Sequence, residues 1–205
     1  MIENVTLTAT LTVPPPDVRE AARYSRSMIG DGQTEALIQR CISAMPIKEK
    51  ATVVYRIVPI SVQDDTVRTP FCEINSAALS QVLKGCTRVV LFVLTAGIEY
   101  DIFINKNEKI SPALALVGSA LGSERAESIA DAFCDRIGAM LAEEGYALTR
   151  RFSPGYADLS LELQRDIFNL LKPEKYIGVY LNDSLLMSPS KSVTALIGVI
   201  SNDLS

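Results

Sequence analysis

The sequence contains no histidine, and this absence excludes several kinds of chemistry. A serine or cysteine nucleophile activated by histidine cannot form, and histidine is also missing as a general base. The commonest metal-ligand sets lose their main nitrogen donor. Any chemistry must then use carboxylates, tyrosine, arginine, lysine, serine or a bound cofactor. If a metal takes part, we expect a ligand or another protein to bring it, and we assign no catalytic residue and no metal site to this chain.

Cysteine is sparse and tryptophan is absent. The four cysteines are widely scattered and form no C-x-x-C pair, at Cys41, Cys72, Cys86 and Cys134. In a reducing compartment such cysteines are usually buried thiols, and we expect that here rather than a metal or redox role.

The features of membrane, secreted and nucleic-acid-binding proteins are also missing. No apolar run reaches the roughly 18 residues of a membrane span, and the first residues lack the basic and apolar regions of a signal peptide. The formal net charge is −4, without a compensating cluster of lysine and arginine. We expect a cytoplasmic protein that binds neither nucleic acid nor membrane.

Hydrophobic residues make up 48% of the 205 residues, which is enough for a complete core. We see no internal repeat or linker and expect a single domain over residues 1–205. Alternating apolar and threonine residues predict a half-buried strand over residues 5–13. Further strands are expected at residues 52–60, 67–71, 88–94, 176–181 and 193–200.

Helical spacing of apolar residues predicts the remaining elements. We expect helices over residues 17–27 with Asp17 as N-cap, 34–45 with Thr34 as N-cap, 76–83, 112–145 with a break near Gly122, and 159–171. Small residues at Gly118 and Gly122 indicate close helix packing rather than a phosphate loop. Because strands and helices do not alternate regularly, the fold class is α+β, with helices packed on a mostly antiparallel sheet.

The segment that follows the long helix is built like a ligand-binding loop. Arginines lead into Ser153-Pro154-Gly155, which can continue neither a helix nor a strand, and Tyr156 follows directly. Such a loop can bring backbone groups close to a small ligand beside a cation and an aromatic ring. An ordinary turn, with Arg151 in an ion pair with Glu143 or Glu144, is the alternative.

Two segments together carry a family resemblance. Residues 151–156 match R-x-x-x-G-Y, and residues 181–189 look like L-T-E-S-x-x-M-x-P, in the same order and spacing as in one family. The chain thus resembles the AdoMet-binding activation domain of cobalamin-dependent methionine synthase. The likeness is clearest over residues 145–200, and the Ser192-Val193 pair continues it.

The resemblance implies a twisted antiparallel sheet with helices and a site for S-adenosylmethionine (AdoMet). It implies that Arg151 meets the ligand carboxylate, that Gly155 and its neighbours line the ligand, and that Tyr156 lies at the edge shared by ligand and corrin. The residues expected at the site are Arg151, Phe152, Ser153, Gly155, Tyr156, Asp183 and Ser184. Asp183 and Ser184 can equally be turn residues between strands.

The sequence also departs from the family pattern. Ala157-Asp158-Leu159 stands where the family usually continues with P-A-C-P, and the aromatic pair expected beyond the last motif has no counterpart. The tryptophan-containing N-terminal region of the full domain is missing too. These departures indicate a shortened, stand-alone relative.

The first functional hypothesis is an activation-type module that binds AdoMet and docks on a corrinoid protein. Cobalamin would be carried by that partner, for example a truncated methionine synthase, because this chain has no histidine for the lower cobalt ligand. The module would be an accessory part of the methyltransferase rather than an independent enzyme, and would support reductive remethylation of cobalamin. The alternative is a non-catalytic docking module that has lost AdoMet binding.

Overall fold

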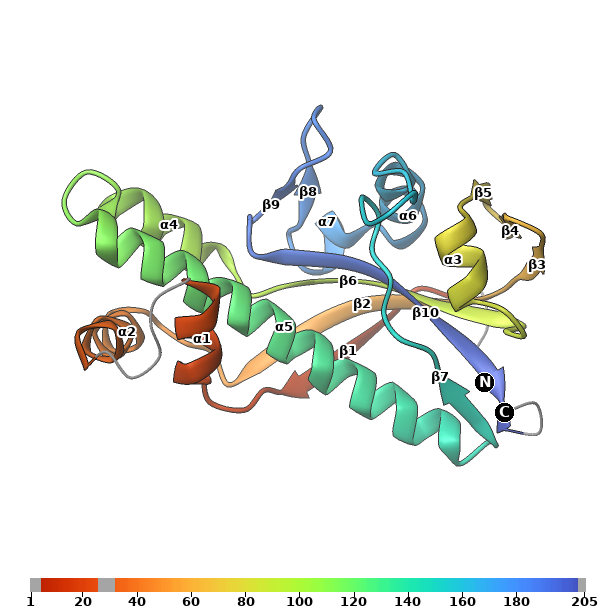
Figure 1. The fold of residues 1–205 in the computed structure, drawn as a ribbon, viewed down its shortest axis with the longest axis horizontal. Coiled ribbons are helices and arrows are strands. Elements are labelled where there is room, and N and C mark those ends of the chain that lie inside the picture. The colour runs from red at the N-terminus through yellow and green to blue at the C-terminus, as the bar shows by residue number, and fades with distance from the viewer. Residues whose placement is uncertain (1–4, 26–31, 203–205) are drawn as a thin grey trace.

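The computed structural model describes residues 5–25 and 32–202 and is built on a curled antiparallel sheet (Figure 1). The five strands lie in the order β1-β2-β6-β10-β7, and each pairs with its neighbours in antiparallel register. Their bounds are Leu7–Thr12 for β1, Lys50–Pro59 for β2, Arg88–Thr95 for β6, Ser192–Ser201 for β10 and Tyr146–Leu148 for β7. The α+β prediction is confirmed, although β7 was not expected.

Strand burial follows the position of each strand in the sheet. Strand β6 lies at the centre, and every residue between its two ends is buried. Strand β1 lies at an edge, where Ala9 and Leu11 are buried while the threonines at positions 8, 10 and 12 are exposed. This alternation is the one that the sequence predicts, because one face of an edge strand packs on the core and the other meets solvent.

The helix α5 (Pro112–Ala142) covers one face of the sheet as a single element of 31 residues. Its Phe133 ring packs on Tyr55 and Phe92, with ring centroids 5.3 and 4.9 Å away. The break that we expected near Gly122 is therefore wrong. The absence of a side chain at Gly118 and Gly122 instead gives room to the rings of a second helix.

That second helix is α4 (Ile98–Asn107), which the sequence patterns did not predict. A Cβ atom added to Gly118 would lie 2.7 Å from the Phe103 ring, and one added to Gly122 would lie 2.8 Å from the Tyr100 ring. The expected role of these glycines in close helix packing is confirmed.

The opposite face of the sheet is covered by α3 (Ala77–Val82), α6 (Leu163–Leu171) and α7 (Pro173–Tyr176) (Figure 1). The strand expected over residues 176–181 is wrong except for its end, because α7 continues through Tyr176 and only Tyr180–Leu181 (β8) is extended. Helix α6 also begins four residues later than expected, at Leu163.

Two small antiparallel sheets complete this side of the molecule. One contains β3 (Ser61–Gln63), β4 (Thr66–Arg68) and β5 (Glu73–Asn75), so the strand expected over residues 67–71 is displaced and shorter. The other pairs β8 with β9 (Met187–Ser188).

The helices α1 (Val18–Tyr24) and α2 (Gly32–Ala44) pack on the end of α5 that carries α4. Asp17 caps α1 as predicted, because its carboxylate accepts hydrogen bonds from the backbone N–H groups of Arg19 and Glu20. Helix α2 begins at Gly32, before the expected cap Thr34. The expected end of the first helix near residue 27 and the glycine at position 30 lie outside the described residues.

The cysteines are free thiols, and Cys41 and Cys86 are buried, while Cys72 and Cys134 are partly exposed. In the described ranges, no helix combines the length and the hydropathy that crossing a membrane requires.

Candidate functional site

The predicted loop is anchored along the strand β10. Phe152 and Leu196 exchange two backbone hydrogen bonds, of 2.9 and 2.8 Å, which extend the pairing beyond β7. The Phe152 side chain is only 4% exposed and joins the core on the α6 face of the sheet. Arg151, one residue earlier, consequently points toward the other face, where α5 lies.

The turn after Phe152 is held by its own backbone. The N–H of Tyr156 donates to the Ser153 carbonyl at 3.2 Å, and the N–H of Gly155 donates to the Leu159 carbonyl at 2.8 Å. Gly155 has a φ of +85°, which a residue with a side chain adopts only with strain. The Tyr156 ring meets the Phe152 ring edge to face and remains 66% exposed. The loop thus presents an aromatic surface to solvent from a rigid base.

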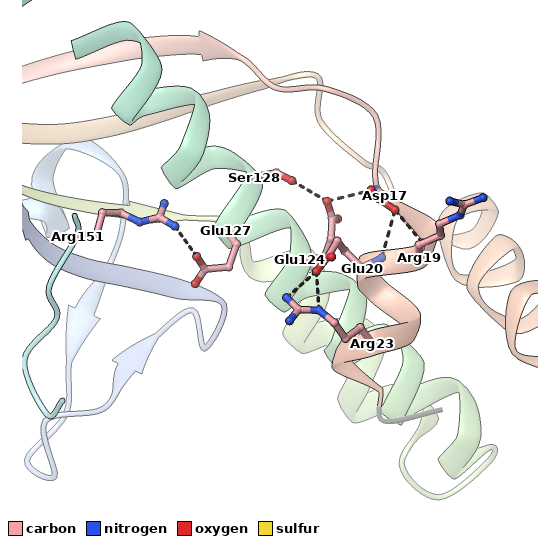
Figure 2. Close-up of polar contacts among 8 residues, drawn as sticks. All are labelled: Asp17, Arg19, Glu20, Arg23, Glu124, Glu127, Ser128 and Arg151. Atoms are coloured by element: carbon pink, nitrogen blue, oxygen red, sulfur yellow. Dashed lines mark hydrogen bonds and ion pairs between the residues drawn. The ribbon is translucent and has the colours of Figure 1, made fainter. Parts of the chain in front are cut away.

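Arg151 reaches two carboxylates of the long helix. Its Nη2 atom lies 2.9 Å from Glu127 Oε2 and 2.9 Å from Asp131 Oδ1, and the contact with Glu127 is drawn in Figure 2. The ion pair with Glu143 or Glu144 that we weighed from the sequence is therefore wrong. The second nitrogen, Nη1, is buried and has no hydrogen-bond partner among the described residues.

A thiol lies close to the same guanidinium. Burial raises the pKa of the Cys134 thiol, and the neighbouring Arg151 opposes that shift. The thiol is thus kept in its neutral form beside the cation and is a weaker acceptor for it than the carboxylates are.

Two cavities meet at this loop. The smaller, of about 250 Å³, is lined by Glu127, Arg151, Phe152, Ser153, Tyr156, Val193 and Ala195. The larger, of about 580 Å³, shares Glu127, Ser153 and Val193 with it. Its other walls come from α6 and the β8–β9 connection, including Gln164, Asn182, Leu185, Leu186 and Met187. The structure thus brings together the two sequence segments whose order and spacing carried the family resemblance.

The predicted site residues differ in how closely they approach these cavities. Arg151, Phe152, Ser153 and Tyr156 line the smaller one, and Gly155 lies within the turn between them. Asp183 and Ser184 are exposed in the β8–β9 turn and line neither cavity. Their ligand role remains a prediction.

The turn itself is organised by a residue that the sequence reasoning passed over. Asn182 Oδ1 accepts hydrogen bonds from the N–H groups of Ser184 and Leu186, at 3.0 and 2.9 Å. The side chain thus fixes the position of Leu186, whose own side chain lines the larger cavity.

A third cavity, of about 450 Å³, lies between α1 and α5 and also includes Glu127 and Arg151 in its walls. The Glu127–Arg151 ion pair consequently lies where the smaller cavity, of about 250 Å³, meets this third one. Sequence reasoning missed Glu127 and Asp131. Their spacing of four residues, which puts both on one face of a helix, was the available signal.

One further cavity, of about 430 Å³, is remote from this loop. It lies where the start of β2 meets the end of β6, and its Lys48 is paired with Glu99 at 2.5 Å. None of the buried polar side-chain atoms that lack a partner in the described ranges belongs to its walls. Two such atoms, Glu124 Oε2 and Arg151 Nη1, belong instead to residues that line the cavities around Arg151.

Fold and cavities together define a class: an α+β domain with an arginine-centred site between the edge of the sheet and a long helix. Residues 88–202, more than half of the chain, match the family model described as "Vitamin B12 dependent methionine synthase, activation domain". The chain belongs to this family, as its two motifs predicted.

A solved structure has the same fold. It is described as the MetH reactivation domain bound to AdoHcy, and the match has a TM-score of 0.64 and 16% sequence identity. The match covers 96% of this chain and 78% of the other. None of the curated proteins compared with this chain matches it.

Proposed function

We propose that this chain binds AdoMet in the cavities beside Arg151 and docks on a corrinoid-binding protein to support remethylation of cobalamin. Membership of the activation-domain family supports the proposal. So does the similarity to a reactivation domain that was solved with AdoHcy, the demethylated form of AdoMet. The arrangement of Arg151 is the observation that carries the AdoMet part.

The Nη1 atom of Arg151 is buried and lacks a hydrogen-bond partner among the described residues, and a ligand carboxylate can replace the two carboxylates paired with Nη2. An unsatisfied donor of this kind costs about 1–3 kcal/mol, and a carboxylate is the partner that a guanidinium fork fits best. The side chains of Glu127 and Asp131 are 44% and 68% exposed, so they can rotate toward solvent when a ligand carboxylate arrives. The methionine part of AdoMet supplies such a carboxylate.

The neighbouring cavities suit the rest of the ligand. The larger one has more apolar than polar wall, with Leu186 and Met187 on one side. The exposed Tyr156 ring stands at the rim of the smaller one and offers a face to a planar base or a sulfonium.

The chain's own contribution would be binding and orientation. When bound, AdoMet would supply a methyl group to a corrinoid that an external electron donor has reduced. The chain has no histidine, and methyl transfer from a bound donor needs none, so it would act by holding the methyl donor in position. The lower cobalt ligand would have to come from the partner.

Calorimetric titration with AdoMet tests the proposal. We expect binding to the unaltered chain, and a loss of about 10-fold to 100-fold in affinity for Arg151→Ala, since a hydrogen-bonded charge pair contributes about 1.5–3 kcal/mol. Arg150→Ala is the matched control, because Arg150 is the exposed neighbour and lines none of the three cavities. Absence of heat at millimolar AdoMet would contradict the AdoMet part.

A second candidate, docking without AdoMet binding, is favoured by the residues after the loop. Ala157 has a φ of +52° and Asp158 is engaged with α3, so the usual continuation of the family motif is replaced by a structural anchor. A pull-down with a methionine synthase that lacks its activation domain tests docking. Both candidates predict association, and only the first predicts AdoMet binding.

We further propose that residues 1–205 fold as a single domain that acts in the cytoplasm. The support is that the first and last long strands, β1 and β10, belong to the same sheet and that α5 packs on both. Unfolding by urea should give one transition by fluorescence and by circular dichroism. Separate transitions would contradict a single domain.

A further inference from the structure

The cavity between α1 and α5 has walls dominated by acidic side chains. Asp17 and Glu20 come from the start of α1, and Glu124, Glu127 and Asp131 come from α5. Two arginines also contribute, but each is already paired. Arg23 pairs with Glu20 at 2.7 Å and Arg151 with Glu127 (Figure 2), and Arg151 also pairs with Asp131. Carboxylates thus outnumber cations, and the cavity favours a positively charged guest.

Glu124 is the acidic residue of this cavity whose hydrogen bonds are incomplete among the described residues. Its side chain is only 2% exposed. One oxygen, Oε1, accepts from the backbone N–H of Asp17 at 3.2 Å and from Ser128 Oγ at 2.6 Å (Figure 2). The other, Oε2, is buried and has no partner among the described residues. A buried carboxylate oxygen without a donor is costly, so a donor from a ligand is the natural completion.

A metal ion is the first cation to consider, and the geometry does not suit one. No group of three or more histidine, cysteine, aspartate or glutamate side chains converges to hold a metal ion within residues 5–25 and 32–202. An ammonium group requires less, because it carries three donors and is satisfied by separate acceptors.

The position of the cavity fixes which amine can reach it. Glu127 and Arg151 form walls of both this cavity and the one below the Tyr156 ring. In an α-amino acid the ammonium and the carboxylate are attached to the same carbon atom. A ligand whose carboxylate meets Arg151 therefore carries its ammonium to the same junction.

We infer that the α1–α5 cavity binds the α-ammonium group of the ligand and that Glu124 Oε2 is its main acceptor. This inference rests on the proposed AdoMet function and assigns a binding role to Glu124 and to the helix α1 that covers it. The shielding of Oε2 from solvent makes the pair strong, since its charges interact in a medium of low dielectric. The site would discriminate amino-acid-bearing nucleosides from nucleosides without that group.

Titration calorimetry with two variants and three ligands tests the inference. The ligands are AdoMet, its analogue with hydrogen in place of the α-amino group, and 5′-methylthioadenosine, which lacks the amino-acid part. For Glu124→Gln we expect AdoMet affinity to fall about 10-fold to 100-fold, the range for a hydrogen bond to a charged group. Affinity for 5′-methylthioadenosine should stay within about twofold, as neither variant touches its site.

Glu20→Gln is the matched control. It removes the same charge from the same cavity, but the Glu20 carboxylate already pairs with Arg23 and is exposed. AdoMet affinity should change by less than about threefold, because exposed pairs contribute little. A loss equal to that of Glu124→Gln would show a general effect of charge and would overturn the role of Glu124.

The amine-free analogue distinguishes the loss of the ammonium–Glu124 contact from an effect of the Glu124→Gln substitution on folding. The unaltered chain should bind it more weakly than AdoMet by about the factor lost in Glu124→Gln, a comparison that needs no variant. In Glu124→Gln the two ligands should then bind almost equally. If the unaltered chain binds both ligands alike, the inference fails while the AdoMet proposal stands. If the unaltered chain binds neither AdoMet nor 5′-methylthioadenosine, both fail.

Discussion

Asp158 and Ser76 lie 82 positions apart in the chain and share a hydrogen bond of 2.5 Å. The same carboxylate accepts from the backbone N–H groups of Ala77 at 2.7 Å and Ala78 at 3.3 Å, at the start of α3. Ser76 Oγ in turn accepts from the N–H of Leu79. Asp158, two residues after the Arg151–Tyr156 loop, thus ties this loop to the helix α3, which lies about 80 residues earlier in the chain.

Replacing Asp158 by asparagine should therefore destabilise the chain in a pH-dependent way. The hydrogen bond from Ser76, with those from the Ala77 and Ala78 backbone, lowers the pKa of Asp158. A lowered aspartate pKa stabilises the fold above the ordinary value of about 3.9, and this contribution is lost as pH falls through the folded-state pKa. The urea midpoint at pH 7 should be lower for Asp158→Asn than for the unaltered chain, and the difference should be smaller at pH 3.

Asp135→Asn provides the control, because Asp135 is exposed on α5. It should leave the urea midpoint almost unchanged at both pH values. If the Asp158 variant differed equally at pH 7 and pH 3, the charge of the carboxylate would not be the cause.

Gly198 is the glycine of β10 that packs against α3. A Cβ atom there would lie 2.6 Å from Cys86 Sγ, 2.7 Å from Leu83 Cδ2 and 3.0 Å from Thr149 Cγ2. Because Leu83 and Cys86 belong to the core, Gly198→Ala should lower the free energy of unfolding by about 1–3 kcal/mol, which chemical denaturation measures.

Gly138→Ala is the matched comparison for that variant. Gly138 lies in α5, and its added Cβ would meet only Leu148 Cδ1, at an ordinary 3.5 Å. Alanine has the higher helix propensity, so the variant should be neutral or up to about 1 kcal/mol more stable. Equal losses at both glycines would contradict the packing account.

Sequence patterns predicted the elements in which the regularly spaced apolar residues are the ones that the structure buries. The strand around Leu7–Thr12, the cap at Asp17 and the central strand Arg88–Thr95 are examples. The helix α4 was missed because apolar residues such as Ile98 and Ile102 are exposed, so burial does not follow the helical period. The β7 strand has three residues and exists only through its pairing with β10.

Of the candidate site, the sequence predicted only the part formed by one continuous segment, the loop around Arg151. The loop around Arg151 carries a motif, whereas its partners Glu127 and Asp131 lie on a helix where carboxylates normally face solvent. Only the packing of α5 across the sheet brings them to Arg151. Lys191 is a second example, because only the fold brings its ammonium to Ser119 and Ser123, to which it donates, and burial lowers its pKa.

Gln164 is a buried residue of α6 whose side chain supports the β8–β9 turn through a hydrogen bond. Its Nε2 donates to the Leu185 carbonyl at 2.9 Å, which holds the β8–β9 turn where Leu185 has a φ of +63°. Gln164→Leu should destabilise by about 1–3 kcal/mol, because the buried carbonyl loses its donor. Arg165→Leu is the neighbouring control, and its exposed ion pair with Glu162 should contribute less than about 1 kcal/mol. Equal losses in thermal unfolding would contradict this supporting role.

The last prediction concerns the pH dependence of stability that Glu124 creates. Burial raises the pKa of Glu124, and the hydrogen bonds from Ser128 and Asp17 oppose the shift. A carboxyl with a raised folded-state pKa holds its proton more tightly when folded. Its effect is therefore absent below the ordinary glutamate value of about 4.3, and stability is lost as pH rises from there through the folded-state pKa.

Glu124→Gln removes this titration. The free energy of unfolding of the variant, relative to that of the unaltered chain, should therefore rise between about pH 4 and pH 7. Urea denaturation at intervals across that range measures the difference, and Glu20→Gln should show no such trend because Glu20 is paired at the surface. A bound ammonium would satisfy the Glu124 carboxylate and return its pKa toward the ordinary range. Saturating AdoMet should thus flatten the trend in the unaltered chain, whereas 5′-methylthioadenosine should leave it, because only AdoMet carries the amine.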